Sequence, residues 1–267
     1  QPVFPAQPVA DTADLRIAFA VGNVLLMLRK IHGTENNMVM AMLLVDVSSN
    51  DILILAAEDF IGKLPPDLVG LRIADLTRLK CLYQVVGEGT EKIAQLKMKD
   101  TFQLTGPMGN GFDIPALVEQ YRKIAVVGGG IGTAPMYQVT RELAAAGVKP
   151  DVFFGFRDAP YCMEEYRSIA NLVKVSTDTG AVGFHGFVTQ LYDPADYDVV
   201  LVCGPTVMMR NAARLCAEKG TPCFVSLEKK MACGIGACLG CTCETKGGEG
   251  KSVCKNGPVF DATEVFF

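Results

Sequence analysis

Short apolar runs and longer amphipathic stretches alternate along residues 116–226. The apolar runs predict strands at Lys123–Val127, Asp151–Phe156, Leu172–Ser176, Val199–Val202 and Cys223–Ser226. The stretches between them predict helices at Pro135–Ala146, Met163–Ile169 and Val207–Lys219. Strands that alternate with helices indicate a parallel sheet with crossover helices, so we expect an α/β domain over residues 116–226.

The pattern differs on either side of this segment. Before it, runs punctuated by glycine predict a strand at Leu79–Val86, a short helical turn at Thr90–Gln95 and a strand at Thr101–Leu104. This pattern of short strands separated by glycine is typical of the end of a β-barrel, and we expect barrel strands over residues 1–115. From Met231 onward, glycine and cysteine replace the alternation. The chain therefore divides into three expected modules, over residues 1–115, 116–226 and 227–267.

Composition narrows the functional classes. Of the 267 residues, 49% are hydrophobic and 20% are charged, and the net charge is −4. An acidic chain has no electrostatic attraction for nucleic acid, so DNA and RNA are not expected partners. The longest apolar candidates, Met38–Val47 and Ile52–Ala57, are shorter than the about 18 residues of a membrane span. Because Gln1–Pro5 also lacks the features of a signal peptide, we expect a cytoplasmic protein without a membrane span.

Five of the ten cysteines lie within 22 residues near the C-terminus. Four of them, spaced C-x4-C-x2-C-x12-C, are Cys233, Cys238, Cys241 and Cys254. This spacing is typical of the plant-type [2Fe–2S] loop, and the glycines between the cysteines leave backbone N–H groups free to point at sulfur. The alternative is a structural zinc site, which is usually built from C-x2–4-C pairs. Cys243 could replace one of these four as a ligand, but it is interpreted as a thiol that is not a ligand.

Two tight turns follow predicted strands of the α/β segment. The first runs from an apolar strand through glycines into a helix, so its N–H groups can bind a pyrophosphate at the positive helix end. It is not a P-loop, because no Gly-Lys-Ser/Thr follows, and any tight strand-to-helix turn can be rich in glycine. The second turn, read alone, is a loop with a buried cysteine. The candidate dinucleotide-binding residues are Gly128, Gly129, Gly130, Gly132, Thr133, Cys203, Gly204 and Pro205.

Taken in this order, these features resemble the ferredoxin–NADP reductase superfamily, and within it the iron–sulfur electron-transfer subunits of class B dihydroorotate dehydrogenases. The stretches that carry the resemblance are Val3–Gln7, Tyr83–Thr90, Gly106–Phe112, Gly128–Pro135, Met231–Cys241 and Val253–Phe260. The resemblance to this family is good from about residue 79 to the end of the sequence. The resemblance implies a flavin-binding β-barrel, a parallel-sheet NAD domain and a small C-terminal [2Fe–2S] domain.

The resemblance also implies that FAD lies on the barrel. The matching positions, beside the flavin ring and at its phosphates, are Leu82, Tyr83, Gln84, Gly89 and Thr90. Relatives carry Arg-x-x-Ser before a segment like Ile73–Asp75, whereas this chain has Val69 and Arg72 in those places. Residues 10–70 match poorly as a whole. This stretch is therefore either divergent or wrongly recorded.

The chemistry implied by the resemblance belongs to cofactors, and no catalytic side chain is expected in a chain with only His32 and His185. NADH at the glycine turn would reduce FAD, and single electrons would pass to the cluster. In the family, a separate FMN-containing subunit oxidises dihydroorotate to orotate in pyrimidine biosynthesis. We expect that subunit as the partner, in a heterotetramer of two copies of each. The alternatives are a subunit of another NAD(P)H-linked complex, of the hydrogenase or ferredoxin:NADP oxidoreductase type, and a zinc-binding module without redox activity.

Overall fold

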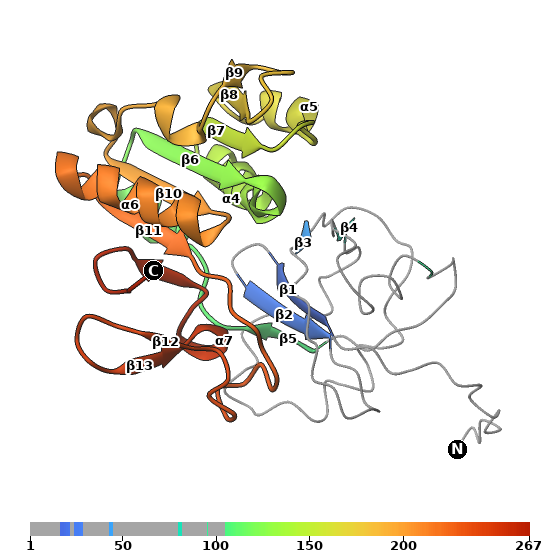
Figure 1. Ribbon diagram of the computed structural model, residues 1–267, viewed down its shortest axis with the longest axis vertical. Coiled ribbons are helices and arrows are strands. Elements are labelled where there is room, and N and C mark those ends of the chain that lie inside the picture. The colour runs from blue at the N-terminus through green and yellow to red at the C-terminus, as the bar shows by residue number, and fades with distance from the viewer. Residues whose placement is uncertain (1–16, 22–23, 29–42, 45–79, 82–94, 96–104) are drawn as a thin grey trace.

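The computed structural model describes residues 17–21, 24–28, 43–44, 80–81, 95 and 105–267. Its main feature is a seven-stranded sheet with the order β14-β11-β10-β6-β7-β8-β9 (Figure 1). The strands are β6 (Ile124–Gly129), β7 (Asp151–Phe156), β8 (Leu172–Thr177), β9 (Phe184–His185), β10 (Val199–Cys203), β11 (Cys223–Ser226) and β14 (Val259–Asp261). All neighbouring strands run parallel except β14, which pairs antiparallel with β11. The predicted parallel sheet is confirmed.

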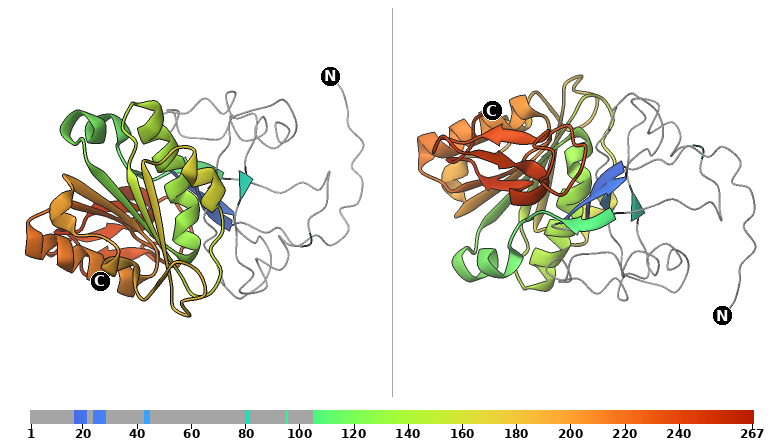
Figure 2. Two further views of the ribbon diagram at one scale, coloured as in Figure 1. Left: turned by 90° about the horizontal axis from the view of Figure 1, so that it is seen from above. Right: turned by 90° about the horizontal axis from the view of Figure 1, so that it is seen from below.

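Helices cover both faces of this sheet, with α4 and α6 on opposite sides (Figure 2). The helices and 3-10 turns are α3 (Ile114–Gln120), η3 (Gly130–Gly132), α4 (Thr133–Ala145), α5 (Met163–Arg167), η4 (Val188–Gln190), η5 (Pro194–Asp196) and α6 (Thr206–Lys219). Side chains alternate between the two faces along each strand, so that Val126 packs toward α4 and Val127 toward α6. Because both faces are covered, the central strands consist almost entirely of apolar residues.

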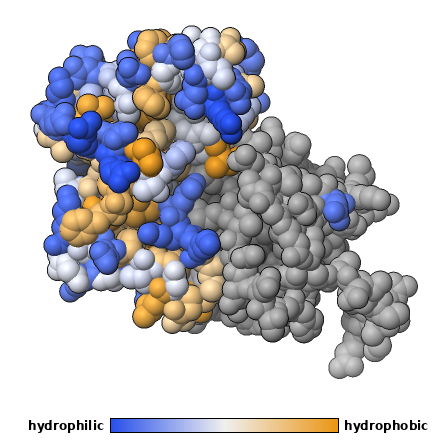
Figure 3. Space-filling model, viewed as in Figure 1, coloured by the Kyte–Doolittle hydropathy of each residue, from blue (hydrophilic) through white to orange (hydrophobic). Residues whose placement is uncertain are grey.

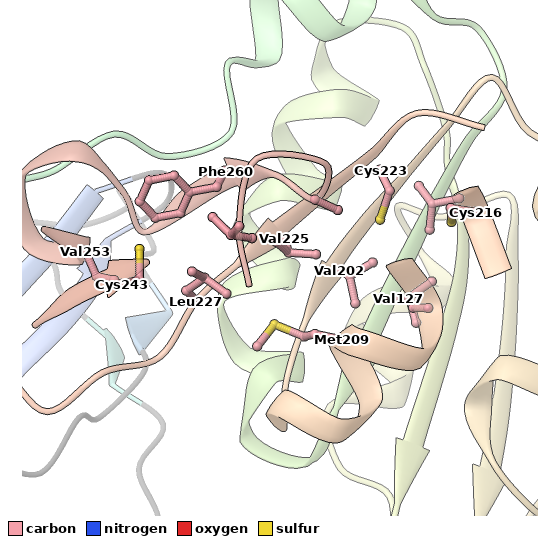
Figure 4. Packing of buried hydrophobic residues seen from close by; sticks show 14 of the residues in the cluster. Val127, Val202, Met209, Cys216, Cys223, Val225, Leu227, Cys243, Val253 and Phe260 are labelled. Carbon is pink, nitrogen blue, oxygen red and sulfur yellow. The ribbon is translucent and has the colours of Figure 1, made fainter. Parts of the chain in front are cut away.

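The C-terminal segment packs onto the α6 side of the sheet. It consists of a hairpin, β12 (Thr242–Glu244) and β13 (Gly250–Ser252), the short helix α7 (Val253–Asn256), and β14. Cys243, Val253 and Phe260 belong to the same hydrophobic core as Met209 of α6 (Figure 4). β14 also extends the large sheet, so residues 227–267 are joined to the α/β segment by backbone pairing as well as by side-chain packing.

The N-terminal part is described at five short strands. β1 (Ile17–Val21), β2 (Val24–Leu28) and β5 (Thr105–Met108) form an antiparallel sheet, and β3 (Leu43–Leu44) pairs with β4 (Lys80–Cys81). Helix α4 lies against β1 and β3. Of the strand expected at Leu79–Val86 the structure describes only β4, and the strand expected at Thr101–Leu104 lies outside the described residues. Among the helices described here, none has the length and apolar character needed to cross a membrane.

Candidate functional site

The strand order reverses direction at β6. Strands β7, β8 and β9 follow one another outward on one side of β6, whereas β10 and β11 lie on its other side. In open α/β sheets, such a switch point leaves a crevice at the carboxyl ends of the strands. Here Gly128 at the end of β6 is the register partner of Cys203 at the end of β10. Both predicted turns therefore lie at this crevice.

The two turns pack directly against each other. A Cβ atom at Gly132 would lie 2.4 Å from the carbonyl oxygen of Cys203, and one at Gly129 would lie 2.4 Å from the Sδ atom of Met208. These positions need glycine because the protein itself fills the space. Gly130 differs, since its φ is +52° and a Cβ atom there would meet no atom of the described residues within 4 Å. Gly130 is therefore the glycine of this turn that the described part of the chain leaves uncovered.

Helix α4 begins at this turn without a side-chain N-cap. The backbone N–H of Thr133 donates to the carbonyls of Gly130 and Ile131 in the preceding 3-10 turn, and this end of α4 is the positive end of the helix dipole. Thr133 is fully buried there, and its Oγ1 atom has no hydrogen-bond partner in the described part of the chain. The Tyr166 hydroxyl donates to the Thr133 carbonyl, and burial raises the pKa of Tyr166 well above its usual value, so the donor keeps its proton. The positive helix end and the Thr133 hydroxyl, which has no partner among the described residues, fit an anionic ligand such as a pyrophosphate.

Each of the four predicted cluster cysteines accepts a backbone N–H. The nitrogen-to-sulfur distances are 3.1 Å from Gly236 to Cys254, 3.3 Å from Cys238 to Cys233, 3.4 Å from Gly240 to Cys238 and 3.4 Å from Cys254 to Cys241. Hydrogen bonds of this kind stabilise sulfur in its charged, metal-binding form. The spacing in the sequence thus brings together four thiols that already receive such bonds.

The four thiols lie as two pairs. Cys233 is hydrogen-bonded to Cys238, which is exposed, and Cys241 is hydrogen-bonded to Cys254, which is buried. Within the described residues, no three His, Cys, Asp or Glu side chains gather around a single metal-ion position. Two pairs of thiols match the donor set of a two-iron cluster held by four cysteines, with two sulfurs for each iron.

The surroundings of Cys233 and Cys254 shift the pKa values of these two thiols in opposite directions. Desolvation raises the pKa of Cys233, but hydrogen bonds from Cys238, Ile235 and Ala237 outweigh it and lower that pKa to about 7. Desolvation and the neighbouring Cys241 thiol raise the pKa of Cys254 to about 12. The Cys254 thiol therefore needs positive charge from a metal to lose its proton at neutral pH.

Cys243 lies apart from these pairs. Its buried thiol donates to the Lys251 carbonyl at 3.3 Å, and it forms part of the α6-side core. Desolvation raises the pKa of Cys243. This environment suits a structural thiol and supports the interpretation of Cys243 as a thiol that is not a ligand.

Loop conformation around the thiols depends on glycine at two positions. Gly234 and Gly236 have φ values of +76° and +77°, which residues with side chains rarely adopt. Lys255 packs its aliphatic chain over Gly236, where an added Cβ atom would lie 2.8 Å from Lys255 Cδ. Ile235 and Leu239 remain exposed beside these glycines, at 57% and 66% of their surface.

Glu228 is a residue at the crevice that the sequence interpretation missed. It lies two positions after β11, and the pKa of the Cys203 thiol is raised by burial and then by the Glu228 carboxylate. The signal in the sequence is an acidic residue directly after an apolar strand, at the edge of the sheet where ligands bind.

The expected FAD positions Leu82, Tyr83, Gln84, Gly89 and Thr90 lie outside the described residues, as do Val69 and Arg72.

Comparison with known proteins identifies relatives over most of the chain. The family model for the iron–sulfur cluster binding domain of dihydroorotate dehydrogenase B matches residues 228–266. The dihydroorotate dehydrogenase B (NAD(+)) electron transfer subunit of Clostridium acetobutylicum is 43% identical over 192 residues, which cover 72% of this chain and 76% of the relative. The same subunit of Caldanaerobacter subterraneus is 39% identical over 195 residues, with 71% and 76% covered.

A solved structure of an NADH-dependent reduced ferredoxin–NADP oxidoreductase, studied for flavin-based electron bifurcation, has a similar fold. Its TM-score is 0.64 at 31% sequence identity, and the match covers 72% of this chain and 70% of that one. The expected fold class is therefore confirmed: a ferredoxin–NADP reductase-like flavin and NAD arrangement with a C-terminal iron–sulfur domain.

Proposed function

This chain belongs to the family of dihydroorotate dehydrogenase B (NAD(+)) electron transfer subunits, and we propose that it moves electrons between NAD(H) and a catalytic partner subunit in pyrimidine biosynthesis. The observation that carries this proposal is the core shared by the α/β segment and the cysteine segment. It joins a dinucleotide crevice and a four-thiol loop in one folded unit, so both cofactor sites of an electron-transfer chain lie on the same unit.

NAD(H) binds at the crevice between β6 and β10. The α4 N-terminus and the open turn at Gly130 take the pyrophosphate, and Thr133 Oγ1 supplies a further hydrogen bond. Gly128, Gly129 and Gly132 hold the first turn against Cys203, Gly204 and Pro205 of the second. This packing places the second turn beside the part of the dinucleotide that extends beyond the pyrophosphate.

Cys233, Cys238, Cys241 and Cys254 hold a [2Fe–2S] cluster, and the N–H groups that point at their sulfurs stabilise the charged thiolates. FAD binds through Leu82, Tyr83, Gln84, Gly89 and Thr90 in the N-terminal barrel. When bound, the flavin exchanges a hydride with the nicotinamide and the cluster carries single electrons. No acid, base or nucleophile of this chain is needed for that chemistry, so no catalytic side chain is assigned.

The partner is a catalytic subunit that contains FMN and oxidises dihydroorotate, assembled as two copies of each chain. The relatives' name supports a catalytic partner, because an electron transfer subunit serves another chain. A cytoplasmic location remains a prediction.

The test compares the isolated chain with the reconstituted complex. The isolated chain, carrying its flavin and cluster, should oxidise NADH with an artificial acceptor but should form no orotate from dihydroorotate. Orotate formation should begin when the FMN subunit is added. Turnover of dihydroorotate by the chain alone would contradict the proposal.

A second function within the same superfamily is favoured by the likeness to the NADH-dependent reduced ferredoxin–NADP oxidoreductase. A subunit of that kind would support NADH-dependent electron transfer from reduced ferredoxin to NADP+, without any FMN subunit. The higher identity to the dihydroorotate dehydrogenase B subunits favours the first function.

A further inference from the structure

The turn after β5 belongs to the Gly106–Phe112 stretch, to which neither the dinucleotide site nor the cysteine site assigns a role. Strand β5 pairs with β2 in the N-terminal sheet, whereas Asn110, two residues past the strand, forms a parallel bridge with Pro258. Figure 1 shows the end of β5 beside α7, the short helix that carries Cys254. The turn therefore connects the N-terminal sheet directly to the segment that holds the cluster cysteines.

Asn110 bonds the C-terminal end of α7 through its side chain and its backbone. Its Nδ2 group donates to the carbonyl oxygens of Lys255 at 3.0 Å and Asn256 at 3.3 Å. Its backbone N–H donates to the Gly257 carbonyl at 2.5 Å. Carbonyls at the end of a helix have no partner within the helix, and these three bonds satisfy them. An amide side chain suits this position because its NH2 group has two donors.

The turn also lies against the backbone of Cys254. Gly109 has a φ of +76°, and a Cβ atom there would collide with the Gly257 carbonyl oxygen. The same Cβ atom would lie 3.1 Å from the Cys254 carbonyl oxygen. The Cys254 sulfur, for its part, accepts the Gly236 N–H at 3.1 Å. Cys254 is therefore held by the glycine loop at its sulfur and by the β5 turn at its carbonyl.

Satisfying the end of a short helix does not by itself require this arrangement. Asn110 is exposed, so water could bond the same carbonyls, and a neutral hydrogen bond contributes only about 1 kcal/mol. Water cannot fix the position of α7 relative to β5, whereas a side chain attached to the β5 turn can. In metal sites, contacts behind the ligands orient those ligands and tune the metal.

We propose that Asn110 is a positioning residue for the cluster: it holds α7, and with it the ligand Cys254, in place against the end of β5. Because β5 belongs to the part of the chain in which FAD is proposed to bind, the same contacts fix the cluster relative to the flavin. This inference rests on the proposed function, since it assumes a cluster at Cys254 and FAD in the N-terminal part.

The experiment compares variants of the full chain that carries its flavin and cluster. Asn110→Asp keeps the shape of the side chain but turns an oxygen, in place of the NH2 donor, toward the two carbonyls. Asn110→Ala removes the side-chain bonds without adding charge, and Asn110→Gln keeps the donor. The measurements are the electron paramagnetic resonance spectrum of the dithionite-reduced cluster and the rate at which a chelator removes its iron.

Asn110→Asp and Asn110→Ala should change the g-values of the cluster and speed iron removal about 10-fold, the factor expected for the loss of one or two hydrogen bonds. Asn110→Gln should recover part of both effects. The rate of flavin reduction by NADH should stay the same, because the contacts of Asn110 are with α7 and its neighbours. Asn211→Ala is the matched control, since it removes an exposed amide side chain of α6 and should change nothing.

An unaltered spectrum and iron-removal rate in both Asn110→Asp and Asn110→Ala would overturn the positioning role, even if the unfolding temperature falls. A parallel loss of flavin reduction by NADH would also overturn it, because the damage would then be general. If Asn110→Asp does not fold, Asn110→Ala and Asn110→Gln decide the question. Absence of iron from the unaltered chain would instead overturn the proposed cluster site itself.

Discussion

The glycines of the first turn have different physical roles, although they look alike in the sequence. Gly132 allows the close approach of the Cys203 carbonyl, so a side chain there would collide with the protein. Gly130 has no described atom within 4 Å of where its Cβ would lie, and its φ of +52° is left-handed. A substitution at Gly130 therefore tests the ligand, and a substitution at Gly132 tests the packing of the turns.

Gly130→Asp should weaken NAD(H) binding at the turn, because it adds a negative charge where the pyrophosphate binds. Gly130→Asn is the matched control, since Asn has the same shape without the charge and both residues tolerate a left-handed φ. The measurement is the NADH concentration that half-saturates flavin reduction, which should rise more for Asp than for Asn. Equal effects of the two substitutions would mean that no phosphate lies beside Gly130.

Gly132→Ala should lower the unfolding temperature, whereas Gly130→Asn should cost only about 1 kcal/mol of backbone strain. The reason is that the Cβ atom added at position 132 would have to displace the backbone at Cys203, only 2.4 Å away. Thermal unfolding followed by circular dichroism compares the two variants. If both unfold at the same temperature, the close approach of the two turns does not contribute to stability.

The thiol environments predict which cysteines keep the iron. Cys254→Ser should lose the cluster, because Cys254 forms the inner pair with Cys241, whereas Cys243→Ser should retain it. Iron and acid-labile sulfide analysis should give about two of each per chain for the unaltered protein and for Cys243→Ser. Retention of iron in Cys254→Ser with its loss in Cys243→Ser would show that the ligand assignment is wrong.

At the scale of single residues, the sequence predicts the role of the cysteines better than it predicts the position of Glu228 at the crevice. Four cysteines at a fixed spacing around glycines indicate a cluster-binding loop by themselves, and the structure brings them into two hydrogen-bonded pairs. Glu228 has no such motif. Its significance comes from β10 and β11 being neighbours, and that neighbour relation is set by the order of strands in the sheet.

At the scale of elements, the strands and helices of residues 116–226 follow the hydrophobic pattern closely. Predicted and observed β7 and β11 have the same bounds, and α6 begins one residue earlier than expected. The pattern misses the two-residue β9 and the strands β12, β13 and β14. These are two or three residues long, so their pairing depends on partners distant in sequence and not on a repeating pattern.

The α6-side core makes the C-terminal segment part of the same cooperative unit as the sheet. Phe260 of β14 is 5% exposed and packs in that core, whereas Phe187 is 71% exposed. The family model that begins at residue 228 therefore describes a segment that contributes a strand to the preceding sheet. The boundary expected at residue 227 remains a prediction.

Phe260→Ala should lower the free energy of unfolding by about 3–5 kcal/mol, the usual cost of removing a buried aromatic ring. Because the core is shared, far-ultraviolet circular dichroism and visible absorption of the cluster should report one transition, shifted to lower temperature. Phe187→Ala is the matched control and should change stability by less than about 0.5 kcal/mol. Separate transitions for the two probes would show that the cysteine segment unfolds on its own.

At the scale of the whole molecule, hydrophilic and hydrophobic residues are interspersed on the face seen in Figure 3. The cysteine loop adds a local feature, because exposed Ile235 and Leu239 flank the exposed Cys238. Apolar side chains beside the outer thiol pair suit a surface that a partner covers during electron transfer. The outer pair is also where a bound cluster would come nearest to another chain.

Replacing these apolar side chains should weaken assembly with the catalytic partner subunit while the chain's own NADH oxidation is retained. We choose Leu239→Asn, since Asn tolerates the φ of +57° at that position, together with Ile235→Ser. If the two residues are central to the interface, each should cost about 2 kcal/mol of binding, and about 30-fold in the dissociation constant. The measurement is orotate formation as the partner concentration is varied, with NADH oxidation by an artificial acceptor measured in parallel.

Val207→Ser, which replaces an exposed apolar residue on α6, should leave both rates unchanged. Full orotate formation by the loop variant at low partner concentration would place the partner on another surface, whereas a parallel fall in both rates would show damage to the cluster instead of the interface.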